Sequence, residues 1–212
     1  MRMMPLNQQY KKTDRVYQRL GDHVEFTYSD GDHTEDTLLK IVKEADDLSI
    51  ASLHWQRHIT DWPTLYHFSP KRGDLLRPFK DSLKNKTVLE LGAGCGAITR
   101  FLGESEARIT AVEGSLRRAT ITAERCRDLP NVAVVCDKIE QFISDEQFDF
   151  VILVGVLEYS HQFILTEKPD LNLLQRVRKH LAPGGSLIIA IENKFGLKYW
   201  AGAPEDHVGQ PY

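Results

Sequence analysis

Residues Val88–Glu104 read VLELGAGCGAITRFLGE, and this stretch decides the fold of the chain. It begins with a short apolar run that contains one acid, Glu90, as in a buried strand. Three glycines at alternate positions follow, Gly92, Gly94 and Gly96, and apolar residues then recur at helical spacing. Glycine permits positive φ and lets a ligand approach bare backbone, and a helix N-terminus favours a negatively charged group. The stretch therefore predicts a strand, a glycine turn and a helix that together bind a nucleotide-type cofactor.

The turn alone does not separate NAD from S-adenosylmethionine (SAM). Its spacing Gly92-x-Gly94-x-x-Ala97 also satisfies the dinucleotide fingerprint. Glu113, about twenty residues further on, would suit a ribose in either case. A tight turn that binds nothing is the third interpretation, although three glycines weaken a turn unless something requires them.

The composition is that of an ordinary globular protein. The 212 residues are 42% hydrophobic and 27% charged, with a net charge of −3 and no block of like charge. We therefore expect no nucleic-acid partner. Three scattered cysteines favour a reducing compartment over disulfides or zinc, so we expect a cytoplasmic protein. The apolar run Phe150–Leu157 is too short for a transmembrane segment, and the first residues do not read as a signal peptide.

Residues 1–80 are expected to form an N-terminal helical extension to a core over residues 81–212. A short strand is expected around Val24–Tyr28, and helices from Thr37 and over Ser49–Ile59. Asp61-Trp62-Pro63 is expected to break the second helix, and Ser69-Pro70 to start another.

Two clusters in this extension carry possible functions. Tyr66 and His67 belong to an aromatic group that is either a hydrophobic plug between helices or a lid facing the cofactor, and both interpretations stay open. An acidic group precedes the first long helix, and we interpret it as a solvated loop and predict no metal site; it comprises Asp30, Asp32, His33, Glu35 and Asp36.

From residue 87 the pattern alternates between strands and helices. The strands are predicted at Val88–Leu91, Arg108–Glu113, Val132–Cys136, Phe148–Val156 and Ser186–Ile191. This order predicts an α/β fold, a Rossmann-like open and mostly parallel sheet with right-handed crossovers. Ligands bind such a sheet at the carboxyl ends of the strands. The candidate cofactor-binding residues that follow the later strands are Glu113, Gly114, Asp137, Lys138, Ile139, Gly155 and Val156.

Taken together, VLELGAGCG, VEG, CDKIEQF, FDFVILVGVLEYS and LAPGGSLIIAIEN resemble a class I SAM-dependent methyltransferase over roughly residues 87–193. The resemblance implies that Glu113 holds the ribose hydroxyls and Asp137 the adenine amine. It implies that Glu90 orients the glycine loop or the SAM amino group. The loop itself, Gly92, Ala93, Gly94 and Gly96, would bind the methionine end and ribose of SAM, with Tyr66 facing it from the lid.

The family fold has seven strands, and the last two have no room before Tyr212. We therefore expect a sheet that lacks them, in a fragment of a longer protein. Two flanking segments, DWPTLYHFSPKRGDLLRP and IENKFGLKYWAGAPEDH, resemble methyltransferase domains associated with bacterial surface-polysaccharide enzymes, often beside glycosyltransferase modules. This resemblance implies a glycan acceptor, with methylation of a sugar hydroxyl or phosphate oxygen.

A hydroxyl acceptor needs a general base, whereas a phosphate does not. The candidate bases are His161, just past the fourth strand, and His67 in the lid. Lys194, Lys198 and Trp200 either pack on the sheet edge or form a wall for the acceptor. Two other functions stay open: a non-catalytic SAM-binding module of a larger enzyme, and an NAD-dependent oxidoreductase, for which no convincing Tyr-x-x-x-Lys pair follows the fourth strand.

Overall fold

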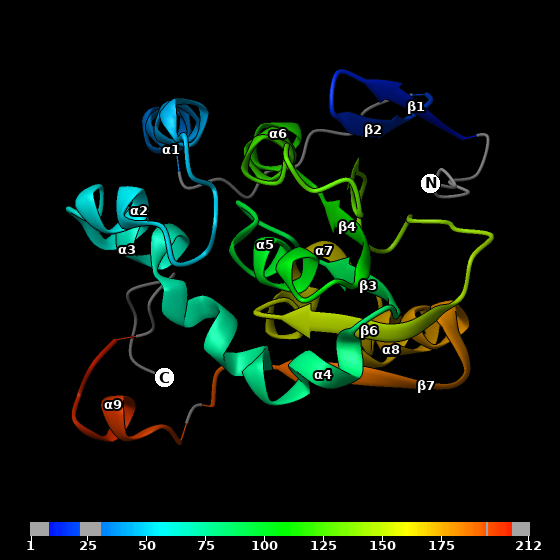
Figure 1. Cartoon of the computed structure of the whole chain (residues 1–212). Helices are drawn as coiled ribbons and strands as arrows, with labels where there is room; N and C mark the ends of the chain where they lie inside the picture. Colours follow the sequence, from blue (N-terminus) through cyan, green and yellow to red (C-terminus); the bar gives the residue numbers. More distant parts are fainter. Residues whose placement is uncertain (1–8, 22–30, 194, 205–212) are drawn as a thin grey trace.

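A seven-stranded sheet forms the centre of the molecule in the computed structural model, which describes residues 9–21, 31–193 and 195–204 (Figure 1). The strand order is β1-β2-β5-β4-β3-β6-β7. All neighbours from β2 to β7 are parallel, and only β1 runs antiparallel to its neighbour β2. The predicted open and mostly parallel sheet is thus confirmed.

The strands are β1 (Tyr10–Thr13), β2 (Val16–Arg19), β3 (Thr87–Leu91), β4 (Arg108–Glu113), β5 (Val132–Cys136), β6 (Phe148–Val154) and β7 (Leu181–Ala190). The helices are α1 (Asp32–Glu44), α2 (Leu53–Arg57), α3 (Trp62–Phe68), α4 (Lys80–Leu83), α5 (Ala97–Glu104), α6 (Leu116–Arg125), α7 (Ser160–Phe163), α8 (Pro169–His180) and α9 (Leu197–Trp200), with the 3-10 segments η1 (Pro70–Phe79) and η2 (Leu157–Tyr159).

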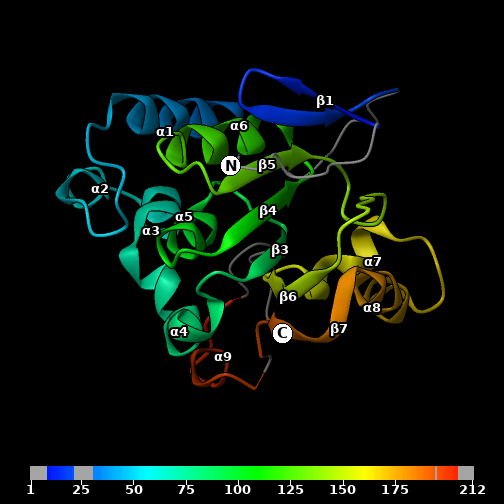
Figure 2. The same ribbon diagram turned by 45° about the vertical axis from the view of Figure 1, so that its right-hand side comes forward.

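Helices cover both faces of the sheet. On one face, η1, α4, α5 and α6 pack against it through a core that includes Leu76, Phe101 and Leu102. On the other face, α8 contributes Leu173 and Val177 to a second core. Figure 2 shows α8 on the opposite side of the sheet from α5. Parallel strands buried on both faces are expected to be almost continuously apolar, as β3 and β6 are.

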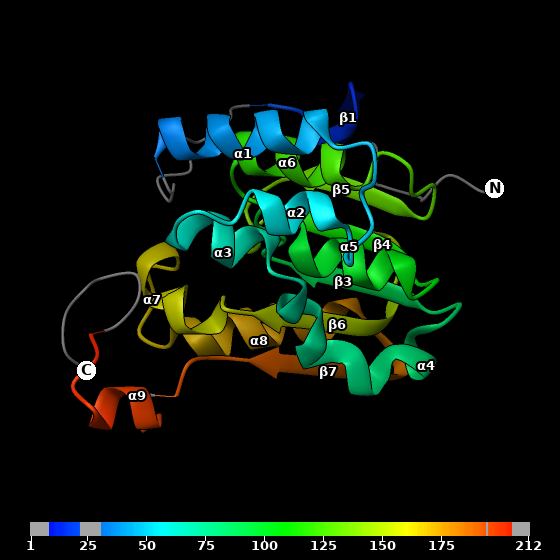
Figure 3. The same cartoon turned by 60° about the vertical axis from the view of Figure 1, so that its left-hand side comes forward.

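A third apolar cluster joins the N-terminal helices to this frame. It brings Leu38 of α1, Trp55 of α2 and Phe68 of α3 together with Ile121 of α6 and Cys95 of the glycine loop. Figure 3 shows α1 lying along α6, with α2 and α3 beside α5. The helical extension is thus packed directly behind the predicted cofactor loop.

The N-terminal region departs from the expected helical extension, because it begins with two strands that were not expected. β1 and β2 form a hairpin that extends the sheet, because β2 pairs in parallel with β5. Two of its residues, Tyr10 and Val16, are buried. The strand expected around Val24–Tyr28 lies outside the described residues. Within the described chain β7 is an edge strand, and the seven strands are completed by the hairpin at the opposite edge.

The expected break before Asp61-Trp62-Pro63 is present, because α2 ends at Arg57, but the same residues also begin a further helix, α3, that was not expected. The Asp61 side chain caps the helix by accepting from the Thr64 N–H at 2.9 Å. Proline in the first turn has no intrahelical partner to lose, so Pro63 fits there. Ser69-Pro70 does start the next helical segment, η1, as predicted, and the Ser69 hydroxyl accepts from the Lys71 N–H.

We predict that Leu89→Ala in β3 lowers the free energy of unfolding by about 2–5 kcal/mol, because the Leu89 side chain is fully buried between the two helical layers. Urea unfolding followed by circular dichroism measures the change. The control is Leu165→Ala, since Leu165 is 95% exposed, and we expect a change within about 0.5 kcal/mol. Equal effects of the two substitutions would contradict the packing described above.

Candidate functional site

A pocket opens at the carboxyl ends of β3, β4 and β6 and is closed from one side by α3 and η1. It is lined by Tyr66, His67, Arg72, Glu90, Gly92, Ala93, Gly94, Cys95, Ala97, Ile98, Glu113, Gly114, Arg118, Ile139, Glu140, Val154, Gly155, Val156, Tyr159, Ser160, Ile164 and Leu173. The pocket therefore lies at the edge of the sheet where the sequence predicts it.

The glycine loop takes a backbone path that other residues rarely follow. The φ angles of Gly92, Gly94 and Gly96 are 84°, 57° and 79°. A Cβ at Gly92 would lie 2.4 Å from Cγ2 of Val156, across the pocket. Gly96 does not line the pocket in the described structure; it caps α5, and a Cβ there would lie 3.0 Å from Cα of Thr122. Of the predicted loop contacts, the structure thus brings Gly92, Ala93 and Gly94 to the pocket.

Glu113 fixes the position of this loop. Its Oε2 atom accepts from the Gly94 N–H at 2.8 Å, and its Oε1 atom accepts from the Ser115 N–H at 3.0 Å. Each carboxylate oxygen has a second lone pair, so these two bonds leave capacity for ribose hydroxyls. Glu113 and Gly114 both line the pocket, as predicted.

Glu90 lies beneath the loop in an almost fully buried position. Its Oε2 atom accepts from the Thr99 hydroxyl at 2.6 Å. Burial raises the pKa of the Glu90 carboxyl to about 8, and the Thr99 hydrogen bond opposes this only in part. A cationic group placed in the pocket would favour the ionised form, which fits the expected role beside an amino group.

The lid interpretation of the aromatic segment agrees with the geometry. Tyr66 and His67 of α3 both line the pocket, and His67 is buried. The Arg72 guanidinium lies 4.2 Å from the Tyr66 ring centroid and donates to the Tyr66 hydroxyl at 3.2 Å. From behind, the fully buried Arg125 donates to the His67 carbonyl at 2.6 Å. Arg125 also stacks against Trp55 and thereby ties the lid to the helices around it.

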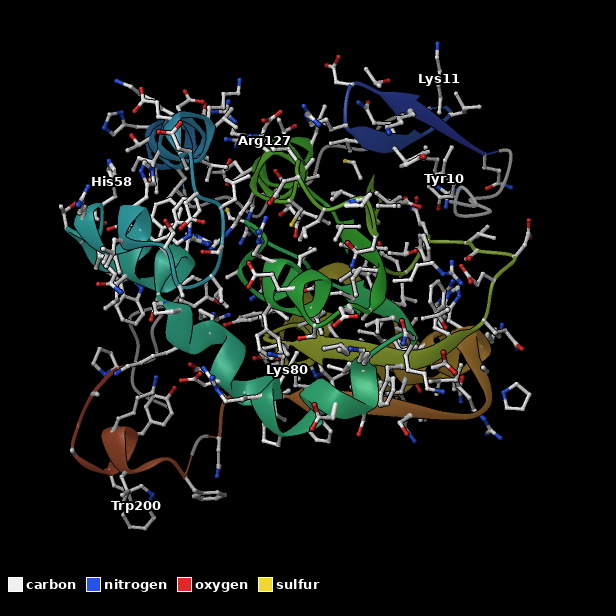
Figure 4. All side chains as sticks on the ribbon, in the orientation of Figure 1. Tyr10, Lys11, His58, Lys80, Arg127 and Trp200 are labelled. Carbon is white, nitrogen blue, oxygen red and sulfur yellow. The ribbon has the colours of Figure 1, made fainter. Side chains whose placement is uncertain are left out.

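The residues after β5 divide between two environments. Ile139 and Glu140 line the pocket, whereas Asp137 and Lys138 are not among its described lining residues. The Asp137 carboxylate instead accepts from the Tyr10 hydroxyl at 2.5 Å and from Arg19 Nη2 at 2.8 Å. In the described structure Asp137 thus contacts the N-terminal hairpin, and its contact with adenine stays a prediction. Figure 4 shows Tyr10 and Lys11 on this hairpin, and Tyr10 is the buried one of the two.

Some of the residues that follow β6 and β7 line the pocket, and others lie outside it. Gly155 and Val156 line the pocket as predicted, and so do Tyr159 and Ser160. His161 is exposed on α7 and lies outside the described pocket lining. The expected acceptor wall is partly outside the described residues, because Lys194 is not described.

The two remaining wall residues lie near the chain end. Lys198 forms an ion pair with Glu192 at 3.3 Å, and Trp200 is 76% exposed. Figure 4 shows Trp200 projecting from the α9 segment, away from the sheet.

The acidic group that was expected to be a solvated loop lies in the first turns of α1, with Glu35 buried, except for Asp30, which is outside the described residues. Arg117 of α6 contacts Asp32, Glu35 and Asp36, the nearest at 2.7 Å. No group of residues suited to a metal ion occurs in the described part of the chain. No described helix has the length and apolar character needed to cross a membrane.

Several residues that line the pocket were not named from the sequence; some of them lie inside the sequence motifs and others in segments brought there by tertiary packing. They are Arg72, Cys95, Ala97, Ile98, Arg118, Glu140, Val154, Tyr159, Ser160, Ile164 and Leu173. Arg118 could have been found from helical spacing, since it stands one turn into the helix that follows Glu113 and Gly114.

Residues 89–187 match the family model described as "Methyltransferase domain". Over these residues the chain carries a methyltransferase domain, in agreement with the class I SAM-dependent methyltransferase that its sequence resembles. The predicted resemblance and fold class are thereby confirmed.

Relatives and solved structures extend the comparison. Nodulation protein S of Rhizobium tropici is 28% identical over 113 residues, 53% of this chain and 46% of the relative. A tRNA U34 carboxymethyltransferase of Pseudoalteromonas atlantica is 30% identical over 118 residues, 54% of this chain and 34% of the relative. The chain thus spans less than half the length of these curated relatives.

The fold is that of the N-methyltransferase NodS from Bradyrhizobium japonicum WM9. Its complex with S-adenosylhomocysteine matches with a TM-score of 0.50 and 24% identity, covering 74% of this chain and 72% of that chain. A second NodS structure matches with a TM-score of 0.50 and 25% identity, over 56% of this chain and 65% of that chain.

The residues of the pocket fit a SAM-type cofactor. Gly92 and Gly94 line the pocket without side chains of their own, and Glu113 keeps acceptor capacity. Apolar Ile139 and Val156 can cover a planar base, and buried Glu90 can face an amino group.

We predict that Gly92→Ala weakens binding of S-adenosylhomocysteine at least about tenfold, or about 1.4 kcal/mol, because the new methyl group would collide with Val156. Isothermal titration calorimetry measures the change. The matched control is Gly184→Ala, since Gly184 also has positive φ (79°) but no neighbour within 4 Å of an added Cβ. Unchanged affinity in Gly92→Ala would place the ligand elsewhere.

We also predict that the stability difference between the native protein and Glu90→Gln depends on pH. The Glu90 pKa is about 8 in the folded state and near its ordinary 4.5 in the unfolded chain, so the folded state binds one more proton between these values. The native protein should therefore lose stability relative to Glu90→Gln as pH rises from about 4.5 to 8, by up to about 1.4 kcal/mol per pH unit.

Urea unfolding at pH 5, 7 and 9 tests this dependence. The control is Glu167→Gln at an exposed position, for which we expect no comparable trend. A pH-independent difference for Glu90→Gln would mean that Glu90 stays ionised throughout.

Proposed function

We propose that this chain transfers a methyl group from SAM to an oxygen of a sugar- or phosphate-containing acceptor, in the assembly of a surface polysaccharide. The main support for methyl transfer from SAM is the pocket at the carboxyl ends of β3, β4 and β6. Glycines of positive φ and Glu113 form this pocket. The acceptor class is supported by the two flanking segments that resemble methyltransferase domains of surface-polysaccharide enzymes.

The reaction requires mainly that the protein align the acceptor atom with the methyl group of SAM. SAM supplies a methyl carbon activated by the positive charge on sulfur, and the reaction is an in-line displacement. On the protein side, the glycine loop and Glu113 hold the nucleoside, and Glu90 orients the amino-acid end. The lid residues Tyr66 and His67 exclude water and face the acceptor.

His67 is the better-placed of the two candidate bases for a hydroxyl acceptor. His67 lines the pocket, whereas His161 is exposed and outside the described lining. The His67 main-chain carbonyl is held by Arg125 independently of the side chain, so a substitution at His67 keeps that anchor. His67 would take the proton of the acceptor hydroxyl as the new carbon–oxygen bond forms.

The names of the relatives indicate different methyl acceptors. A ribosomal RNA methyltransferase of Streptococcus gordonii is 46% identical over 52 residues, 24% of this chain and 18% of the relative. A tRNA enzyme and an N-methyltransferase also match. The acceptor panel in the test therefore includes RNA and amino sugars beside neutral and phosphorylated sugars.

We predict that the protein transfers radiolabelled methyl from SAM to a sugar hydroxyl, and that His67→Gln lowers the rate by about 10²–10⁴-fold. Binding of S-adenosylhomocysteine, measured by calorimetry, should change little. His33→Gln is the control, since His33 is exposed on α1, far along the chain from the pocket.

Other outcomes separate the alternatives. Transfer to an amine or to RNA with none to sugars would contradict the proposed acceptor. A large loss of transfer rate in His161→Gln with no loss in His67→Gln would assign the general base to His161 on α7. Cofactor binding with no transfer to any acceptor favours a non-catalytic SAM-binding module, and binding of NAD alone favours an oxidoreductase.

A further inference from the structure

A single guanidinium group lies between the glycine loop and the lid helix α3. Arg125, the last residue of α6, is fully buried. Its Nη1 atom donates to the His67 carbonyl at 2.6 Å and to the Cys95 carbonyl at 3.5 Å. His67 belongs to α3, Cys95 belongs to the glycine loop, and both line the pocket. One nitrogen atom thus contacts the main chain on two sides of the pocket.

Helix α6 supports the glycine loop from one face. Thr122 and Arg125 lie on this face, because residues three apart in a helix are neighbours on its surface. The Thr122 hydroxyl donates to the Gly94 carbonyl at 2.7 Å. On the lid side, the His67 carbonyl lies in the last turn of α3, where carbonyl groups have no partner within the helix and a cation is favourable. Arg125 therefore joins the supported loop to the end of the lid helix.

The buried position of Arg125 is costly for a cation. Its Nε and Nη2 atoms have no hydrogen-bond partner among the described residues. Burial lowers the pKa of the Arg125 guanidinium to about 10, which leaves it charged at neutral pH. The ring centroids of Trp55 and Phe68 lie 5.0 Å and 5.6 Å from its Cζ atom and stabilise the charge in part. Buried ionic groups contribute little net stability, and their better-attested role is to fix one geometry.

Arg127, two residues further along the chain, makes contacts of the same kind away from the pocket. Its Nη1 atom donates to the Val42 carbonyl at 2.9 Å, and its Nη2 atom donates to the Ala45 carbonyl. Neither of these two residues is among the described lining residues of the pocket. Of the two arginines, Arg125 is therefore the one whose contacts reach the pocket.

We propose that Arg125 is a positioning residue that couples the lid to the glycine loop, so that a cofactor held by the loop also fixes the lid over the pocket. Arg125 acts through the main chain of Cys95 and His67, and it does not itself line the pocket. This inference rests on the proposed function, because it takes a SAM-type cofactor to be the ligand of the loop.

The test follows hydrogen exchange of the α3 amides by mass spectrometry, with and without S-adenosylhomocysteine. Binding that makes an element more rigid slows its local opening and hence its exchange. In the native protein, saturating ligand should slow exchange in α3 at least about fivefold, the lower end of the usual coupling between two sites. In Arg125→Met, which keeps a long apolar side chain but has no donor, the slowing should fall to about twofold or less.

Three further variants make the result specific. Arg127→Met, the matched control, should keep the native slowing, because its contacts do not reach the pocket. Arg125→Lys keeps a cationic donor nitrogen and should restore most of the slowing, since one nitrogen makes both contacts in the native protein. Arg125→Gln, whose amide nitrogen is too short to reach both carbonyls, replaces Arg125→Met if that variant does not fold. Calorimetry sets a saturating ligand concentration for each variant.

Three results would overturn the inference and leave the proposed function standing. The first is binding of S-adenosylhomocysteine to the native protein without any slowing in α3. The second is native slowing in Arg125→Met or Arg125→Gln, which would mean that the ligand holds the lid directly. The third is an equal loss of slowing in Arg127→Met, which would mean that any loosening of α6 has this effect. If the native protein does not bind S-adenosylhomocysteine, the proposed function itself is wrong, and the inference falls with it.

Discussion

The Glu113 carboxylate is the contact on which the site depends. One oxygen holds the Gly94 N–H and the other the Ser115 N–H, so a single side chain joins the loop after β3 to the start of α6. The three glycines of the loop can then keep positive φ, a conformation that is costly for residues with a side chain. The positions of the loop, of the two flanking helices and of the pocket floor all follow from this junction.

The N-terminal segment completes the site in two different ways. Its helices supply the wall formed by Tyr66, His67 and Arg72, anchored from behind by the buried Arg125. Its hairpin extends the sheet beside β5 and holds the turn that carries Ile139 and Glu140. A buried ion pair is costly to break once formed, so the Arg19–Asp137 pair favours one fixed geometry for that turn.

The sequence predicted the parts whose signals are local. The glycine spacing located the loop, and apolar runs located β3 to β6, with the bounds of β4 and β5 as expected. The hairpin was missed because four-residue strands with a single buried residue each give little periodic signal. At Asp61-Trp62-Pro63 the sequence predicted the end of one helix but not the start of α3, because a proline that breaks a helix and a proline in a first turn give the same local signal.

The site was predictable where a residue ends a strand and its side chain contacts only the turns beside it. The Glu113 carboxylate accepts from the N–H groups of such turns, whereas the partners of Asp137, Tyr10 and Arg19, are more than 115 residues away in the sequence. Arg72 and Tyr159 come from segments whose approach to the pocket depends on tertiary packing. Long-range contacts of this kind have no local pattern in the chain.

The most direct measurement is a calorimetric titration of the protein with S-adenosylhomocysteine and, separately, with NAD. The geometry of the glycine loop, Glu113 and Glu90 predicts saturable binding of S-adenosylhomocysteine at one site and no detectable binding of NAD. Binding of NAD in the absence of any binding of S-adenosylhomocysteine would contradict the assignment of this pocket to SAM.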